Sequence, residues 1–170
     1  MMKLLKEFVF TNAPESMKSK KSKITIGRKD KVDFPELDLM EIDAKIDTGA
    51  YTGALHCRDI RVYDEEGHEM VYFTLMDQLD PLYDGCRFSL PVASRRVIRN
   101  SFGRAEERII IATTIVLFEK TMPIELSLSD RSEMKYPVLL GRKLLMEGFV
   151  VDVSKTNLSF KKKVKKRSVA

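Results

Sequence analysis

The sequence predicts an all-β domain with one short helix. Short segments in which apolar and polar residues alternate recur along the chain, and residues that favour turns separate them. A helical pattern is convincing only near 142–147, where Gly148 follows in the position that commonly ends a helix. Many short strands with a single helix are typical of a β-barrel or a β-sandwich.

The clearest strands lie in the first third of the chain. Ile24–Arg28 is expected to be the first strand. From Met40 to Asp47, four apolar residues alternate with four charged ones, the pattern of a strand with one buried face. That segment ends at Asp47-Thr48-Gly49, a triplet that favours a turn.

Two hairpins are expected after this turn. Asp64–Gly67 is the turn of the first, and Asn100–Gly103 is the turn of the second. The remaining expected strands are Cys86–Val92, Arg95–Arg99, Glu106–Phe118, Met122–Leu128, Phe149–Val153 and Asn157–Phe160.

The positive charge of the chain is concentrated at its two ends. The sequence has 30 basic and 25 acidic side chains, a formal net charge of +5. Residues 1–31 hold nine basic and three acidic side chains, residues 161–170 hold six and none, and residues 32–160 hold 15 and 22. We therefore expect a flexible basic arm at 1–23, one domain at 24–160 and a solvated, disordered basic tail at 161–170.

Composition limits the cellular setting. No run of about 18 apolar residues is present, so no membrane span is expected. The beginning of the chain has no signal-peptide pattern, and two cysteines are too few for a disulfide framework. We expect free thiols in a reducing cytoplasm; a single Cys57–Cys86 bridge is the alternative.

Two segments carry candidate chemistry. In Asp47-Thr48-Gly49-Ala50, a strand delivers a carboxylate into a tight turn, where backbone N–H groups can hold its oxygens, as a water-activating peptidase requires. An ordinary strand-end turn would have the same triplet. Leu139-Leu140-Gly141-Arg142 is an apolar strand followed by Gly, Arg and the short helix.

Taken together, these segments resemble the retropepsins, which are single-lobe aspartic peptidases. A closer resemblance, from about residue 24 to 160, is to a bacterial retropepsin-like family often labelled "ATP-dependent zinc protease" and associated with RimK-type glutamate ligases. The segments that carry it, in sequence order, are Ile26–Arg28, Ala44–Ala50, Ala54–His56, Arg95–Ile98, Leu128–Ser132 and Leu139–Arg142.

The resemblance implies a closed β-barrel of the acid-protease type. It makes Asp47 the catalytic residue and Thr48, Gly49 and Ala50 its supporting loop. In minimal retropepsins, acids after the Ala pair with the later Arg, but Tyr51-Thr52 stand there in this chain. Arg142 therefore lacks that partner, and Asp130 is a candidate substitute.

The words "zinc" and "ATP" in the family label have no support in the residues. A zinc site needs three or four clustered ligands, and His56, His68, Cys57 and Cys86 are the only His and Cys available. No phosphate-binding Gly-x-x-x-x-Gly-Lys-Ser/Thr loop is present. We expect neither cofactor.

The predicted activity is hydrolysis of peptide bonds in a peptide or protein substrate. An aspartic peptidase needs two carboxylates that share one proton, and this chain has a single Asp-Thr-Gly. A homodimer with Asp47 of each copy at the two-fold axis supplies the pair.

A mobile hairpin is expected to cover the site. Its candidate tip is Asn100, Ser101, Phe102 and Gly103, since Gly and Ser suit a moving turn and Phe102 can contact substrate. A plain surface hairpin fits these residues equally well.

The alternative function is a catalytically inactive, peptidase-like module that binds a protein or ribosomal RNA. The basic ends motivate it, because lysines and arginines bind nucleic acid through phosphate charge. We prefer the simpler interpretation that both ends are solvated and bind no nucleic acid.

Overall fold

The computed structural model describes residues 22–75, 86–99 and 103–169, and strands dominate them. The strands are β1 (Ile24–Gly27), β2 (Lys29–Phe34), β3 (Leu39–Ile46), β4 (Gly53–Glu65), β5 (His68–Leu75), β6 (Arg87–Pro91), β7 (Ser94–Arg99), β8 (Ala105–Leu117), β9 (Lys120–Ser129), β10 (Val138–Leu140) and β11 (Phe149–Asp152). A 3₁₀ turn (Pro35–Leu37) and the helices α1 (Arg142–Leu145) and α2 (Leu158–Arg167) complete the elements. The predicted mostly-β fold is confirmed, and no helix in these ranges could cross a membrane.

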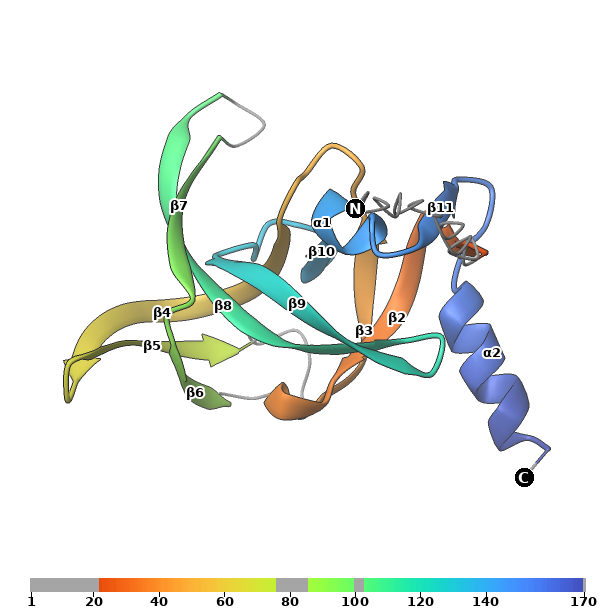
Figure 1. Ribbon diagram of the computed structural model, residues 1–170, viewed down its shortest axis with the longest axis horizontal. Coiled ribbons are helices and arrows are strands. Elements are labelled where there is room, and N and C mark those ends of the chain that lie inside the picture. Colours follow the sequence, from red (N-terminus) through yellow and green to blue (C-terminus); the bar gives the residue numbers. More distant parts are fainter. Residues whose placement is uncertain (1–21, 76–85, 100–102, 170) are drawn as a thin grey trace, which may run out of the picture.

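Strand pairing forms a ring that brings the two candidate segments together. The order of neighbours is β10-β3-β2-β8-β9-β4, and β4 also pairs with β10, which joins the two ends (Figure 1). β10 runs parallel to β3 and antiparallel to β4, so it lies between the strand that enters the Asp47 turn and the strand that leaves it. β5 and β6 extend from β4, β7 pairs with β8, and β1 and β11 form a separate parallel pair.

The core holds this arrangement rigid. Phe34, Leu55, Phe73, Ile111 and Leu126 are fully buried and come from β2, β4, β5, β8 and β9. Burying a side chain of this size contributes roughly 1.5–3 kcal/mol. The turn between β3 and β4 is therefore attached to strands that are fixed by packing.

The predicted strand around residues 40–47 is present, but its first part faces the other way. Met40 was expected to point inward and is 49% exposed, whereas Leu39 is buried. An extra residue on β3 relative to β2 makes a bulge, with Glu41 at φ 58°. A bulge shifts the alternation by one residue, which the apolar–polar pattern alone cannot show. β2 is not evident from the sequence, because charged residues such as Asp30 and Asp33 stand on its buried side.

The C-terminal expectations at 157–170 were wrong. Asn157–Phe160 is predicted to be a strand and 161–170 a disordered tail; instead α2 runs from Leu158 to Arg167, across the expected domain end at 160. The fully buried carboxylate of Asp30 accepts hydrogen bonds from the N–H groups of Ser159 (2.9 Å) and Phe160 (3.0 Å), which begin the helix. Lys163 adds an ion pair to Asp33 at 2.7 Å. The basic segment is ordered because acidic residues of β2 neutralise and cap it.

The expected arm at 1–23 lies, up to residue 21, outside the described residues.

Candidate active site

Asp47 lies at the end of β3, in the turn that leads to β4. Its N–H donates to the carbonyl oxygen of Leu140 on β10 at 3.0 Å, which ties the turn to the ring. Its Oδ1 atom accepts hydrogen bonds from the N–H groups of Gly49 (2.9 Å) and Ala50 (3.2 Å). No hydrogen bond to Oδ2 comes from any residue that the structure describes. One carboxylate oxygen is thus fixed, and the other is available for chemistry.

The segment that follows β10 binds this turn through backbone hydrogen bonds. The N–H groups of Arg142 and Lys143 donate to the carbonyl oxygens of Ala50 (2.8 Å) and Tyr51 (2.9 Å). A Cβ atom on Gly141 would lie 2.7 Å from the Tyr51 carbonyl oxygen, closer than real contacts allow. Glycine is therefore required at 141, because the two backbones approach each other directly.

The partner of Arg142 differs from the one expected. Its Nη1 donates to the carbonyl oxygens of Thr48 (2.8 Å) and Gly49 (2.9 Å), so the guanidinium binds the turn itself. Asp130, the candidate substitute, accepts a hydrogen bond from the Ser132 N–H at 2.9 Å and lies 3.8 Å from His56 Nδ1. The structure brings together Asp47, Thr48, Gly49, Ala50 and Leu139–Arg142, and it does not bring Asp130 to Arg142.

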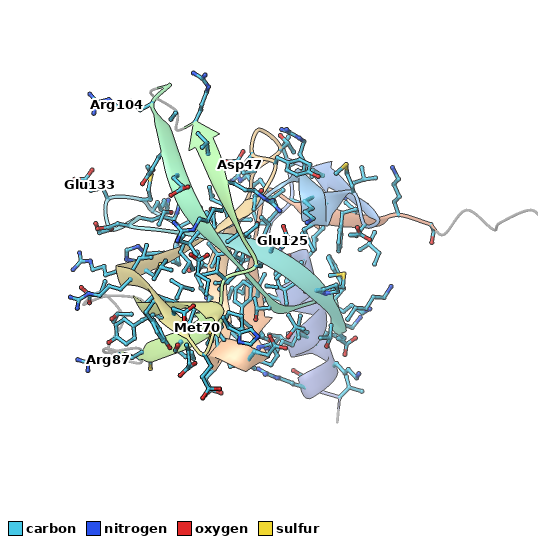
Figure 2. All side chains as sticks on the ribbon, turned by 60° about the vertical axis from the view of Figure 1, so that its left-hand side comes forward. Asp47, Met70, Arg87, Arg104, Glu125 and Glu133 are labelled. Carbon is cyan, nitrogen blue, oxygen red and sulfur yellow. The ribbon has the colours of Figure 1, made fainter. Side chains whose placement is uncertain are left out.

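The β7–β8 hairpin rises at the same end of the molecule as the Asp47 turn (Figures 1 and 2). Of its predicted tip, Asn100, Ser101 and Phe102 lie outside the described residues. Gly103 is described, exposed and at φ 78°, a backbone conformation that favours glycine. The role of this hairpin as a flap stays a prediction.

Glu125 on β9 connects the hairpin to the active-site turn, a link that sequence reasoning missed. Its Oε2 atom lies 2.5 Å from Nη2 of Arg96 on β7 and 2.8 Å from Nζ of Lys143 on α1. Arg96 also donates to Thr52 Oγ1 at 3.1 Å. The hydrogen bond from Lys143, and then the one from Arg96, hold the pKa of Glu125 below its usual value. These residues are far apart in sequence, and no local pattern signals their contact.

The comparison with known families agrees with this geometry. A model of the RimB-like family, described as retropepsin-like aspartic endopeptidase RimB, matches residues 25–162. The chain belongs to the RimB-like family. The family suspected from the sequence is thereby confirmed.

Several relatives share this RimB-like region. Proteins named "Probable alpha-L-glutamate ligase" are 35% identical over 131 residues in Desulfotalea psychrophila and 34% identical over 139 residues in Shewanella pealeana. These matches cover 77% and 79% of this chain but only 28% and 30% of the relatives, so the chain spans under a third of their length. A crystal structure of a Legionella pneumophila protein of unknown function matches with a TM-score of 0.65 and 24% identity, over 79% of this chain and 97% of that one. At that identity it supports the fold alone.

The candidate metal ligands of the RimB-like chain do not form a metal centre in the described ranges, where no cluster of three or more His, Cys, Asp or Glu residues could hold an ion. His56 Nδ1 accepts a hydrogen bond from the Arg131 N–H at 2.7 Å, so that nitrogen is occupied. Burial raises the pKa of the Cys57 thiol to about 12, which keeps it neutral. Cys57 and Cys86 are both free thiols.

A cavity of about 470 Å³ lies next to α1. Residues of β8, β9 and α1 line it, together with Gly53, and most of them present apolar atoms. Asp47, Thr48 and Gly49 are not among the lining residues. Lys143, whose N–H donates to the Tyr51 carbonyl oxygen of the Asp47 turn, and its partner Glu125 do line it.

Proposed function

We propose that the chain is an aspartic peptidase that hydrolyses peptide bonds with Asp47 of two copies. The observation that carries this proposal is the carboxylate of Asp47, which the described residues hold through Oδ1 alone, in a turn that Arg142 itself binds. A carboxylate fixed in this way has one oxygen directed to a ligand or to a second carboxylate. The membership of the retropepsin-like family supports the same assignment.

The mechanism follows from pairing two such carboxylates. Two close carboxylates cannot both be ionised, so one keeps a proton. The ionised Asp47 takes a proton from water as the water oxygen attacks the carbonyl carbon. The protonated Asp47 then donates its proton, and the leaving amine departs with it.

A second copy of the chain would supply the second carboxylate. Thr48 and Gly49 are exposed, and Tyr51 is 52% exposed, so the turn is accessible to a symmetric partner. We infer that the dimer joins at these turns, that Thr48 supports their contact, and that the ring of strands is the closed barrel of an acid-protease lobe. The chemistry calls for no metal or nucleotide, and the free thiols suit the cytoplasm.

We propose an acidic peptide as the substrate class. The relatives that share this region are named as glutamate ligases, which suggests that glutamate-containing chains occur near it. The hairpin beside the Asp47 turn carries five arginines, Arg95, Arg96, Arg99, Arg104 and Arg108, of which the first two and the last pair with carboxylates of the chain. Positive charge beside a binding site attracts an acidic substrate.

The alternative of an inactive module that binds RNA through basic ends has less support. In α2, Lys162 and Lys166 pair with Glu119, and Lys163 and Arg167 pair with Glu41. Together with Asp33, these carboxylates offset part of the positive charge of α2, which leaves less of it for phosphates.

The test is Asp47→Asn, which keeps the shape and removes the charge. With a fluorogenic glutamate-rich peptide, the purified wild-type chain is expected to cleave and Asp47→Asn to lose at least about 100-fold in rate, since base catalysis alone contributes that much. Asp43→Asn, an exposed position on the same strand, is the control and should retain activity. Analytical ultracentrifugation of the wild type and of both variants measures whether each forms a dimer. Undiminished cleavage by a folded Asp47→Asn variant would remove the proposal.

A further inference from the structure

Polar contacts join the candidate catalytic turn, α1, β9 and β7 into a closed circuit. The N–H of Lys143 on α1 donates to the carbonyl oxygen of Tyr51 at 2.9 Å, and Nζ of Lys143 lies 2.8 Å from Oε2 of Glu125. The same carboxylate oxygen accepts a hydrogen bond from Nη2 of Arg96 at 2.5 Å. Nη1 of Arg96 donates to Oγ1 of Thr52 at 3.1 Å, and Thr52 follows Tyr51 in the chain. The circuit therefore begins and ends at the turn.

Arg96 is the side chain through which β7 meets this turn. Along its backbone, β7 pairs with β8 and with no other strand in the described ranges. Successive side chains of a strand point to opposite faces, so Arg95 and Arg96 leave β7 in opposite directions. Arg95 binds Glu69 of β5, whereas Arg96 binds Thr52 and Glu125. The orientation of the hairpin relative to the turn therefore depends on the contacts of Arg96.

Glu125 is the group that allows the two cations of the circuit to approach each other. Without a carboxylate between them, the charges of Arg96 and Lys143 would repel. The side chain of Glu125 is 27% exposed, so its attraction to both is screened less than that of a fully solvated ion pair. A glutamine at 125 keeps the shape but has one acceptor oxygen and no charge, and it cannot hold both donors equally well.

The turn itself has supports that do not involve the Glu125 carboxylate. The guanidinium of Arg142 binds the carbonyl oxygens of Thr48 and Gly49, and the backbone of Lys143 binds Tyr51. Loss of the carboxylate therefore releases the hairpin and leaves the turn in place.

We propose that Glu125 is a positioning residue for substrate binding, because it holds the β7–β8 hairpin in a fixed orientation relative to the Asp47 turn. This inference rests on the proposed peptidase function. A hairpin that is already fixed presents an ordered wall to the substrate, so less conformational freedom is lost on binding. Glu125 does not touch the reacting atoms, and its loss weakens binding of the substrate more than the chemical step.

Steady-state kinetics of the full chain with the fluorogenic glutamate-rich peptide separate binding from chemistry. We expect Glu125→Gln to raise KM about tenfold and to change kcat by less than about threefold. Arg96→Gln should show a similar increase in KM. The double variant should be within about twofold of the weaker-binding single variant, because all three variants break the same contact.

Glu119→Gln is the matched control. Glu119 also pairs with two cations, Lys162 and Lys166, and its side chain is 32% exposed, but it binds α2 instead of the hairpin. This variant should leave both KM and kcat unchanged.

Hydrogen exchange reports on the hairpin without any need for cleavage. In Glu125→Gln, the amides of residues 94–99 should exchange at least about threefold faster than in the wild type, because local opening becomes easier. In Glu119→Gln, exchange at 94–99 should stay as in the wild type.

The two measurements distinguish this inference from the proposed function. If the wild type cleaves and Glu125→Gln keeps its KM, or loses as much in kcat as in KM, the positioning role is overturned and the peptidase function stands. If the wild type does not cleave, the peptidase function fails; faster exchange at 94–99 then keeps Glu125 as the residue that holds the hairpin, and unchanged exchange removes it. If Glu125→Gln does not fold by circular dichroism, Glu125→Asp, one methylene shorter, replaces it. About threefold higher KM is then expected, since both contacts lengthen, and an unchanged KM would overturn the role.

Discussion

The guanidinium of Arg142 donates a hydrogen bond to the carbonyl oxygen of Gly49, 93 residues earlier in the chain, at 2.9 Å. The same nitrogen donates to the carbonyl oxygen of Thr48 at 2.8 Å. The turn that carries Asp47 is therefore held by a side chain of α1, in addition to the hydrogen bonds within the turn. An arginine at this position supports the turn even though no acidic residue in the described part of the chain pairs with it.

Replacing Arg142 by lysine is expected to loosen the turn. Lysine retains the charge, but its shorter reach and single ammonium group do not reproduce the contact with two carbonyl oxygens. Because Arg142 is exposed, we expect a loss of only about 1 kcal/mol in unfolding free energy. The rate of peptide cleavage should fall by more than tenfold, since small displacements of a catalytic group are costly. Arg61→Lys, an exposed substitution on β4, serves as the control, and an Arg142→Lys variant with normal rate would contradict this role.

Replacing Asp30 by asparagine is expected to release the start of α2. The amide has one acceptor oxygen and no charge, so it cannot satisfy the N–H groups of both Ser159 and Phe160 as the carboxylate does. The expected loss is about 1–2 kcal/mol of unfolding free energy, as for the loss of a helix cap. Urea denaturation measures it, and hydrogen exchange over residues 158–167 locates it. Asp43→Asn is the comparison, and unchanged exchange in α2 would show that Asp30 does not cap the helix.

The ion pairs of Glu125 are expected to make stability depend on pH. The pKa of Glu125 is lowered in the folded protein, mainly by its hydrogen bond with Lys143, from an ordinary value of 4.5. Its contribution is therefore complete above about pH 5.5 and disappears as the pH falls through the lower, folded-state pKa. The difference in unfolding free energy between the wild type and Glu125→Gln should be at most about 1 kcal/mol at pH 7, because these groups are partly exposed. This difference in unfolding free energy should shrink toward zero as the pH falls into the acidic range.

Urea denaturation between pH 3 and pH 7 measures this difference. Glu133→Gln, on the exposed β9–β10 connection, is the control and should show no comparable pH dependence. A difference for Glu125→Gln that grows as the pH falls would have the wrong sign and would contradict the assignment.

The predictions that succeeded depend on local pattern. The strand ending at Asp47, the turn after it and the short helix at Arg142 follow from alternation and turn chemistry within a few residues. The predictions that failed depend on neighbours elsewhere in the chain. Met40 turned outward because of a bulge against β2, and residues 158–167 formed a helix because Asp30 and Asp33 bind its first turns.

The sequence by itself determined the strand-rich fold, the family and the single Asp-Thr-Gly turn, because each depends on short, ordered motifs. Only the tertiary structure decided what Arg142 and Glu125 do, because their partners lie between 18 and 94 residues away and meet them through the strand ring. The same holds for the charge of the chain. Its positive end is folded onto its acidic strands, since opposite charges that are distant in sequence attract once the ring has brought them together.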